Sequence, residues 1–213
     1  MSGSPCERPY HESGMTPITT DLSSSGLLEL VHRYYPANRW ESDEGYVASE
    51  QYQRLIQARQ EALNNADSWE RLLSKLRQEL PGCSVEDWSA LFSTDNCRRA
   101  RVYLPEIPQL EDGRQEYRAV VLLVSVLAPV YVRYSSFRRR IRQHLWEKPT
   151  LFYEDVPETQ PYANKVDALV RAELGVHPLP HDTLFTLVPD IQCHNRALGE
   201  ARLIDCLFTD DRW

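Results

Sequence analysis

The feature that most constrains the fold is an apolar run from Tyr117 to Tyr134, in which only Ser125 interrupts the apolar residues between Ala119 and Val132. Runs of valine and leucine without apolar-polar alternation are typical of strands buried on both faces. At about 3.3 Å per residue, a single strand of this length would greatly exceed the usual strand. We therefore predict two strands in a covered sheet, divided near Pro129. A bulge or corner is expected there, because the glycine, asparagine and aspartate of tight hairpins are absent.

The same run does not predict a membrane helix. Crossing a bilayer takes about 20 apolar residues, and Arg118 and Arg133 limit this run to fewer. The N-terminal segment, residues 1–20, lacks the basic end and apolar stretch of a signal peptide. These observations predict a cytoplasmic protein without a membrane contact.

The predicted domain organisation is a flexible tail over residues 1–20 followed by a single domain over residues 21–213. The tail is rich in serine, proline, glycine and threonine and has few apolar side chains that could stabilise an ordered structure. In the remaining chain, helical patterns come early and strand patterns late. This order predicts an α+β fold, with N-terminal helices packed on a mainly antiparallel C-terminal sheet.

Periodicity and capping residues predict the individual elements. Helices are expected at residues 26–35, 49–64, 67–80, 84–92, 136–145 and 161–174. Strands are expected at residues 100–104, 151–153, 184–188 and 201–208, in addition to the central run.

Charge and cysteine content restrict the classes of function. The formal net charge of −7 at pH 7 disfavours a general nucleic-acid binder, which needs a large basic surface. A basic protein is the more natural partner. The five cysteines are odd in number and lack CxxC spacing, which indicates reduced thiols and neither a disulfide framework nor a zinc site.

No cofactor or metal is predicted. None of the eight glycines forms a phosphate-binding loop of the GxGxxG or GxxxxGKS type. His177 with His181, or Cys193 with His194, supply good metal-ligand atoms, but their spacing fits neither one helical face nor one strand face. Loop and surface histidines are the simpler interpretation.

Two catalytic or nucleic-acid functions remain open as alternatives. A hydrolase could assemble a cysteine and a histidine, or paired carboxylates, from distant parts of the chain. An RNA-contacting module could use the predicted helix that carries the basic cluster Arg138–Arg142, although those arginines could equally lie on a solvated helix face.

Two N-terminal segments, LLELVHRYYP (27–36) and YVASEQYQRLIQARQ (46–60), resemble segments of the small immunity proteins of bacterial polymorphic toxin systems. The helical N-terminal half, the antiparallel C-terminal half and the acidity agree with that resemblance. It implies a protein that binds a cognate toxin, often a nuclease, and occludes the toxin's active site. Acidic side chains would then take the place of nucleic-acid phosphates in a basic cleft.

The candidate partner-binding residues are acidic side chains in predicted loops, together with two tryptophans, because aromatic anchors and complementary charge dominate tight interfaces. These candidates are Trp40, Glu41, Asp43, Glu44, Glu154, Asp155, Glu158 and Trp213.

Overall fold

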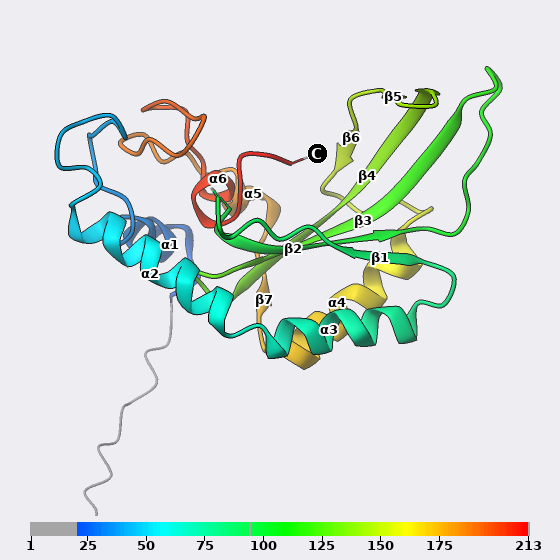
Figure 1. The fold of residues 1–213 in the computed structure, drawn as a ribbon, viewed down its shortest axis with the longest axis horizontal. Coiled ribbons are helices and arrows are strands. Elements are labelled where there is room, and N and C mark those ends of the chain that lie inside the picture. The colour runs from blue at the N-terminus through cyan, green and yellow to red at the C-terminus, as the bar shows by residue number, and fades with distance from the viewer. Residues whose placement is uncertain (1–20, 94, 213) are drawn as a thin grey trace, which may run out of the picture.

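A computed structural model describes residues 21–93 and 95–212, and shows a seven-stranded, mainly antiparallel sheet with helices on both faces (Figure 1). The predicted α+β class is confirmed. The strands are β1 (Ser84–Asp87), β2 (Cys97–Tyr103), β3 (Gln115–Ser125), β4 (Val130–Arg142), β5 (Leu145–Trp146), β6 (Thr150–Phe152) and β7 (His177–Pro178). The helices are α1 (Ser24–Val31), α2 (Glu50–Asn64), α3 (Asp67–Glu79), α4 (Gln160–Leu174), α5 (His181–Leu184) and α6 (Leu203–Leu207). The predicted tail, residues 1–20, lies outside the described residues.

The central run forms β3 and β4, which pair as an antiparallel hairpin with Val121 opposite Tyr134. The predicted division near Pro129 is confirmed, but the expected bulge or corner is wrong. The connection, residues 126–129, is long enough for a four-residue hairpin loop, which does not require the positive φ angles of a two-residue turn. Val121 and Leu123 are fully buried, as the apolar run predicts.

Each face of the sheet has its own apolar core. On one face, α3 and α4 pack over Val120 and Leu122, which confirms that the central run lies in a covered sheet. On the other face, α1, α5 and α6 pack over Val121 and Leu123. In Figure 1, α3 and α4 lie below the sheet and α6 lies above it. Alternate side chains of β3 therefore enter different cores, which explains why the run lacks alternation.

Local capping chemistry fixes two of the predicted helices. The Ser49 side chain accepts a hydrogen bond from the Tyr52 backbone nitrogen at the start of α2 (3.3 Å). Helix α4 has Pro161 in its first turn and ends at Gly175, whose φ of 63° is the left-handed conformation that glycine adopts at low cost.

The predicted helix over residues 136–145 is wrong, and so is the RNA-contacting helix Arg138–Arg142. Strand β4 continues through this segment, because Phe137 to Arg140 pair with residues 115–118 of β3. The apolar residues whose spacing suggested a helix lie instead in two strands: Phe137 and Ile141 in β4, and Leu145 in β5. Arg138 and Arg140 therefore lie on one face of the sheet and Arg139 on the other.

Three other predictions are also wrong. Residues 84–92 begin with strand β1 instead of a helix. Residues 184–188 contain the end of α5 and a single bridge between Leu187 and Arg202. Residues 201–208 contain helix α6 instead of a strand, because Asp205 accepts a hydrogen bond from the Arg202 backbone nitrogen (2.9 Å) and thereby caps a helical turn.

Two short strands pair with one edge of β4 and leave a gap between them. Strand β6 pairs antiparallel with Ser135 to Phe137, and β7 pairs parallel with Val130 and Tyr131. Residues 132–134 lie between these two pairings.

Within the described part of the chain, no helix has the length and apolar character needed to cross a membrane.

Candidate functional site

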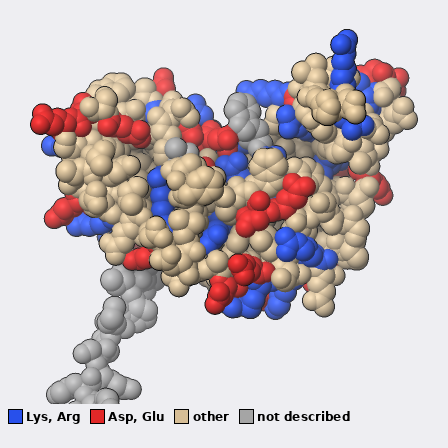
Figure 2. Space-filling view, in the orientation of Figure 1, with Lys and Arg blue, Asp and Glu red and all other residues tan. Residues whose placement is uncertain are grey.

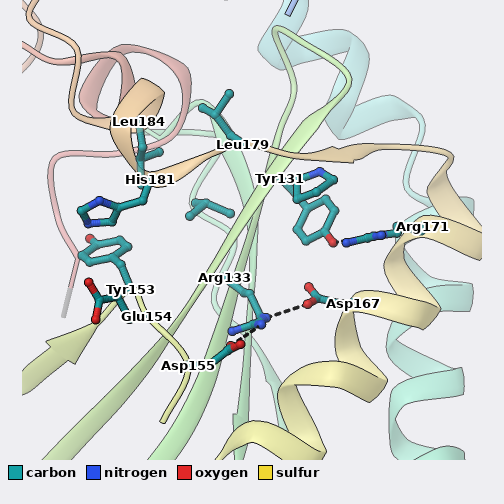
Figure 3. A pocket seen from close by; sticks show the side chains of 12 residues that line it. Tyr131, Arg133, Tyr153, Glu154, Asp155, Asp167, Arg171, Leu179, His181 and Leu184 are labelled. Atoms are coloured by element: carbon teal, nitrogen blue, oxygen red, sulfur yellow. Dashed lines mark hydrogen bonds and ion pairs between the residues drawn. The ribbon is translucent and has the colours of Figure 1, made fainter.

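A cavity of about 450 Å³ lies beside the gap in the pairing of β4. We call it the β4 cavity. Its lining comes from β4, from the segment between β6 and α4, from α4, and from β7 with α5 (Figure 3). The lining residues used below are Tyr131, Arg133, Tyr153, Glu154, Asp155, Asp167, Arg171 and His181.

A guanidinium held by two carboxylates forms the polar wall of the β4 cavity. Arg133 donates to Asp167 Oδ2 through Nε (2.8 Å) and to Asp155 Oδ1 through Nη2 (2.7 Å), as the dashed lines in Figure 3 show. Burial opposes the charge of Arg133, but these hydrogen bonds outweigh it and raise the pKa of Arg133. The charges of this wall are thus largely paired within the protein.

Aromatic side chains form another part of the lining, beside aliphatic residues. Arg171 Nε donates to the Tyr131 hydroxyl (2.9 Å), and the Tyr153 ring lies 5.9 Å from the His181 ring, centroid to centroid. Burial raises the pKa of Tyr153 to about 12, and its hydroxyl has no hydrogen-bond partner among the described residues. The polar contacts within this lining join arginines to carboxylates or a tyrosine, an arrangement that binds and orients polar groups.

The predicted acidic residues of the N-terminal half lie together in an exposed connection between α1 and α2. We call residues 36–48 the acidic loop; Trp40, Glu41, Asp43 and Glu44 are all exposed in it. The Trp40 side chain is 45% exposed although it is large and apolar. The loop lies at the upper left of Figure 1, and Figure 2 shows several acidic side chains on the surface there.

Hydrogen bonds hold the acidic loop in place. The Glu41 backbone nitrogen donates to Gln192 Oε1 (2.7 Å), and the His194 backbone nitrogen donates to Glu41 Oε1 (3.1 Å). Within the loop, the Trp40 backbone nitrogen donates to Asp43 Oδ2 (2.8 Å). Glu41 and Asp43 therefore shape the loop, whereas the carboxylate of Glu44 makes no such bond among the described residues.

The other predicted partner-binding residues are placed differently. Glu154 and Asp155 lie at the β4 cavity, and Glu158 is exposed just before α4. Asp155 is already engaged by Arg133. Trp213 lies outside the described residues. Sequence reasoning missed Asp167 and Arg171, although their spacing of four residues on a predicted helix placed them on one face.

The metal candidates are not assembled into a centre. His177 lies in β7 and His181 begins α5, and both are exposed. The described residues contain no group of three or more histidine, cysteine or carboxylate side chains that could hold a metal ion.

The hydrolase alternative specified no cysteine–histidine pair; in the structure the sequence neighbours Cys193 and His194 interact, and the thiol lies in the interior. Cys193 is fully buried, with Sγ 3.5 Å from the Tyr35 hydroxyl and 3.3 Å from the Asp205 carbonyl oxygen. Burial disfavours its thiolate, yet hydrogen bonds from Cys206 and His194 outweigh burial and lower the pKa of Cys193 to about 6. A nucleophile needs access as well as a low pKa, and Cys193 is inaccessible in this fold.

We predict that Cys193 and Cys206 react with iodoacetamide more slowly in the native protein than after unfolding, by about two orders of magnitude or more, because alkylation requires local opening. Cys83, which is partly exposed, serves as the internal reference. Peptide mass spectrometry after timed alkylation measures each site. Native alkylation of Cys193 as fast as that of Cys83 would restore the cysteine-hydrolase alternative.

Comparison of the chain with protein-family models, with curated proteins and with solved structures gave no match.

Proposed function

We propose that the protein binds a basic protein partner through the acidic loop and inhibits it by occlusion, as an immunity protein does with its toxin. The observation that carries this proposal is an acidic, tryptophan-bearing loop that is exposed and yet held by hydrogen bonds at both Glu41 and Asp43. The net charge of −7 supports a basic partner.

The conformation of the loop favours tight binding. Association normally costs free energy for ordering loops and side chains, and a loop already held in place avoids much of that cost. Asn38 adds to this anchoring, since its backbone nitrogen donates to the Asp190 carbonyl oxygen (2.6 Å). The acidic loop is therefore preorganised on the segment that follows α5.

The side chains of the acidic loop have different roles in recognition. Tryptophan is enriched among the few residues that dominate interface free energy, and Trp40 is the large apolar group of the loop. The Glu44 carboxylate forms no hydrogen bond or ion pair with the other described residues. Its charge can therefore steer a basic partner toward the loop. Glu154 and Glu158 contribute to the same overall negative charge from the segment before α4.

We predict that Trp40→Ala weakens partner binding about thirtyfold or more, because truncating an interface hot spot costs about 2 kcal/mol or more. Glu44→Lys should mainly slow association and reduce its dependence on salt. The binding candidates are the products of genes adjacent to its own, measured by calorimetry and stopped-flow mixing. Co-expression with the partner should relieve that partner's toxicity in the wild type and less so in the variants.

The matched controls are Ile107→Ala and Glu106→Lys, which change an exposed apolar and an exposed acidic side chain in the connection between β2 and β3. They should bind like the wild type. The proposal fails if none of the adjacent-gene products binds, or if Trp40→Ala and Ile107→Ala bind a partner equally well.

A further inference from the structure

One end of the upper sheet face carries arginine and aromatic side chains in place of an apolar core. The strand register puts polar and aromatic side chains around one small hollow of about 80 Å³, which Ala119 and Pro149 also line. We call it the arginine face; it comprises Arg101, Tyr103, Tyr117, Ser136, Arg138 and Trp146. The other end of the same face, at Val121 and Leu123, is covered by the core that includes α6. In Figure 1, the outer ends of β3 and β4 extend beyond α6.

Arg101 is a buried cation, only 6% exposed, that forms no ion pair with another described residue. Its Nε has no hydrogen-bond partner among the described residues either. The contact it does make is with the ring of Trp88, whose centroid lies 4.3 Å from the guanidinium carbon. Glu86 faces Arg101 across β1 and β2, but its carboxylate accepts from Trp88 Nε1 (2.8 Å) and forms no ion pair with Arg101 in the described structure. A buried charge without a counterion is costly, so an anion in the hollow would compensate it.

A second arginine approaches the hollow from β4. Arg138 is exposed, its guanidinium lies 5.0 Å from the Trp146 ring centroid, and its Nε donates to the Glu147 carbonyl oxygen (3.3 Å). Ser136, two residues earlier on the same strand face, adds a hydroxyl to the lining. Figure 2 shows basic side chains on the lobe formed by the outer ends of β3 and β4, at the upper right.

We propose that the arginine face binds one phosphoryl group, with Arg101 as its buried anchor and Arg138 as its outer ligand. Guanidinium groups match phosphate oxygens through paired hydrogen bonds, and two of them favour a dianion. The hollow exceeds the share of liquid volume taken by one water, about 30 Å³, and fits a phosphoryl group but not a whole nucleotide. The group could be free phosphate or the phosphate of a larger monoester, whose remainder would lie over Tyr103 and Tyr117. This inference is independent of the acidic loop.

The test is calorimetric titration of the full chain with inorganic phosphate, at ionic strength held constant with chloride. We expect saturable binding with one site. Arg138→Gln should weaken it about tenfold, since one charge-assisted contact is lost. Arg101→Met should weaken it about thirtyfold or more, as removal of one partner of a buried charge pair does. Circular dichroism checks that each variant folds, and the exposed Arg138 keeps the proposal testable if Arg101→Met does not fold.

Arg142→Gln is the matched control, because Arg142 is exposed on the same strand but does not line the hollow. It should bind phosphate like the wild type. Adenosine monophosphate and adenosine separate the two sources of the group: tighter binding of the monophosphate than of phosphate indicates a monoester, and equal binding indicates free phosphate. Adenosine binding as tightly as its monophosphate would overturn the proposal. So would an equal loss of affinity in Arg138→Gln and Arg142→Gln, or binding that requires a long single-stranded RNA.

Discussion

Leu123→Asp is expected to abolish soluble folding. Leu123 is fully buried in the core beneath α6, and its strand neighbours are Arg99 on β2 and Val132 on β4. Removing the leucine side chain forfeits about 1.5 to 3 kcal/mol of burial. A carboxylate in the same place costs several kcal/mol more, because it would be buried and the neighbouring Arg99 is already paired with Asp95 (3.0 Å). Together these losses approach the roughly 5 to 15 kcal/mol by which a typical domain is stable.

Soluble expression of two control variants and hydrogen exchange of the wild type check this prediction. Leu123→Met keeps the volume and should lose less than about 1.5 kcal/mol. Ile107→Asp introduces the same carboxylate at an exposed apolar site and should stay soluble. In the wild type, the amides of Val120 to Val124 should be among the slowest to exchange with deuterium. A soluble Leu123→Asp protein with native circular dichroism would show that β3 does not hold the core together.

The sequence predicts elements well where a local pattern and a local cap agree. Helix α2 has an apolar stripe behind Ser49, and α4 has a stripe between Pro161 and Gly175, so both were located to within a residue or two. The central run was identified because apolar residues on both faces of a strand leave few alternatives.

The errors arise where tertiary contacts override a short pattern. Phe137 and Ile141 do have the spacing of a helical face. Residues 137–140 nevertheless form a strand, because they pair with residues 115–118 of β3. In α6 the alternation of Leu203 to Phe208 suggested a strand. All these residues are buried whichever face they lie on, so the alternation carried no information about solvent exposure.

The candidate sites differ in the same way. The acids and Trp40 of the acidic loop were predictable, since a polar connection between two helices is exposed. The β4 cavity was not, because it depends on β6 and β7 both pairing with the same edge of β4 from distant parts of the chain. The arginine face likewise required the register that brings Arg101 of β2 near Arg138 of β4.

The second large effect expected is steep alkaline unfolding between pH 10 and 12. Burial raises the pKa of Tyr35, Tyr134 and Tyr153 above the ordinary value of 10.0. Below pH 10 these phenols are neutral in both the folded and the unfolded chain, so their burial is fully favourable. As the pH rises, the unfolded chain loses its phenolic protons first, and stability falls until the folded pKa is passed. By pH 12 the loss amounts to about 2 kcal/mol for each of Tyr134 and Tyr153, about 4 kcal/mol together, and the burial of Tyr35 acts in the same direction.

Tyr153→Phe separates this linkage from general alkaline damage. Its hydroxyl has no partner among the described residues, so its removal should cost little at pH 7. At pH 12 the variant should exceed the wild type in stability by about 2 kcal/mol, because one proton fewer is released on unfolding. Tyr134→Phe should gain a similar amount relative to the wild type between pH 7 and pH 12, but from a lower stability at pH 7, since the Tyr134 hydroxyl donates to the Arg212 carbonyl oxygen (3.2 Å). Urea unfolding at each pH, with tyrosinate absorbance recorded in parallel, measures both quantities. Parallel stability curves for the wild type and Tyr153→Phe up to pH 12 would mean that this phenol ionises without unfolding and that its burial is incomplete.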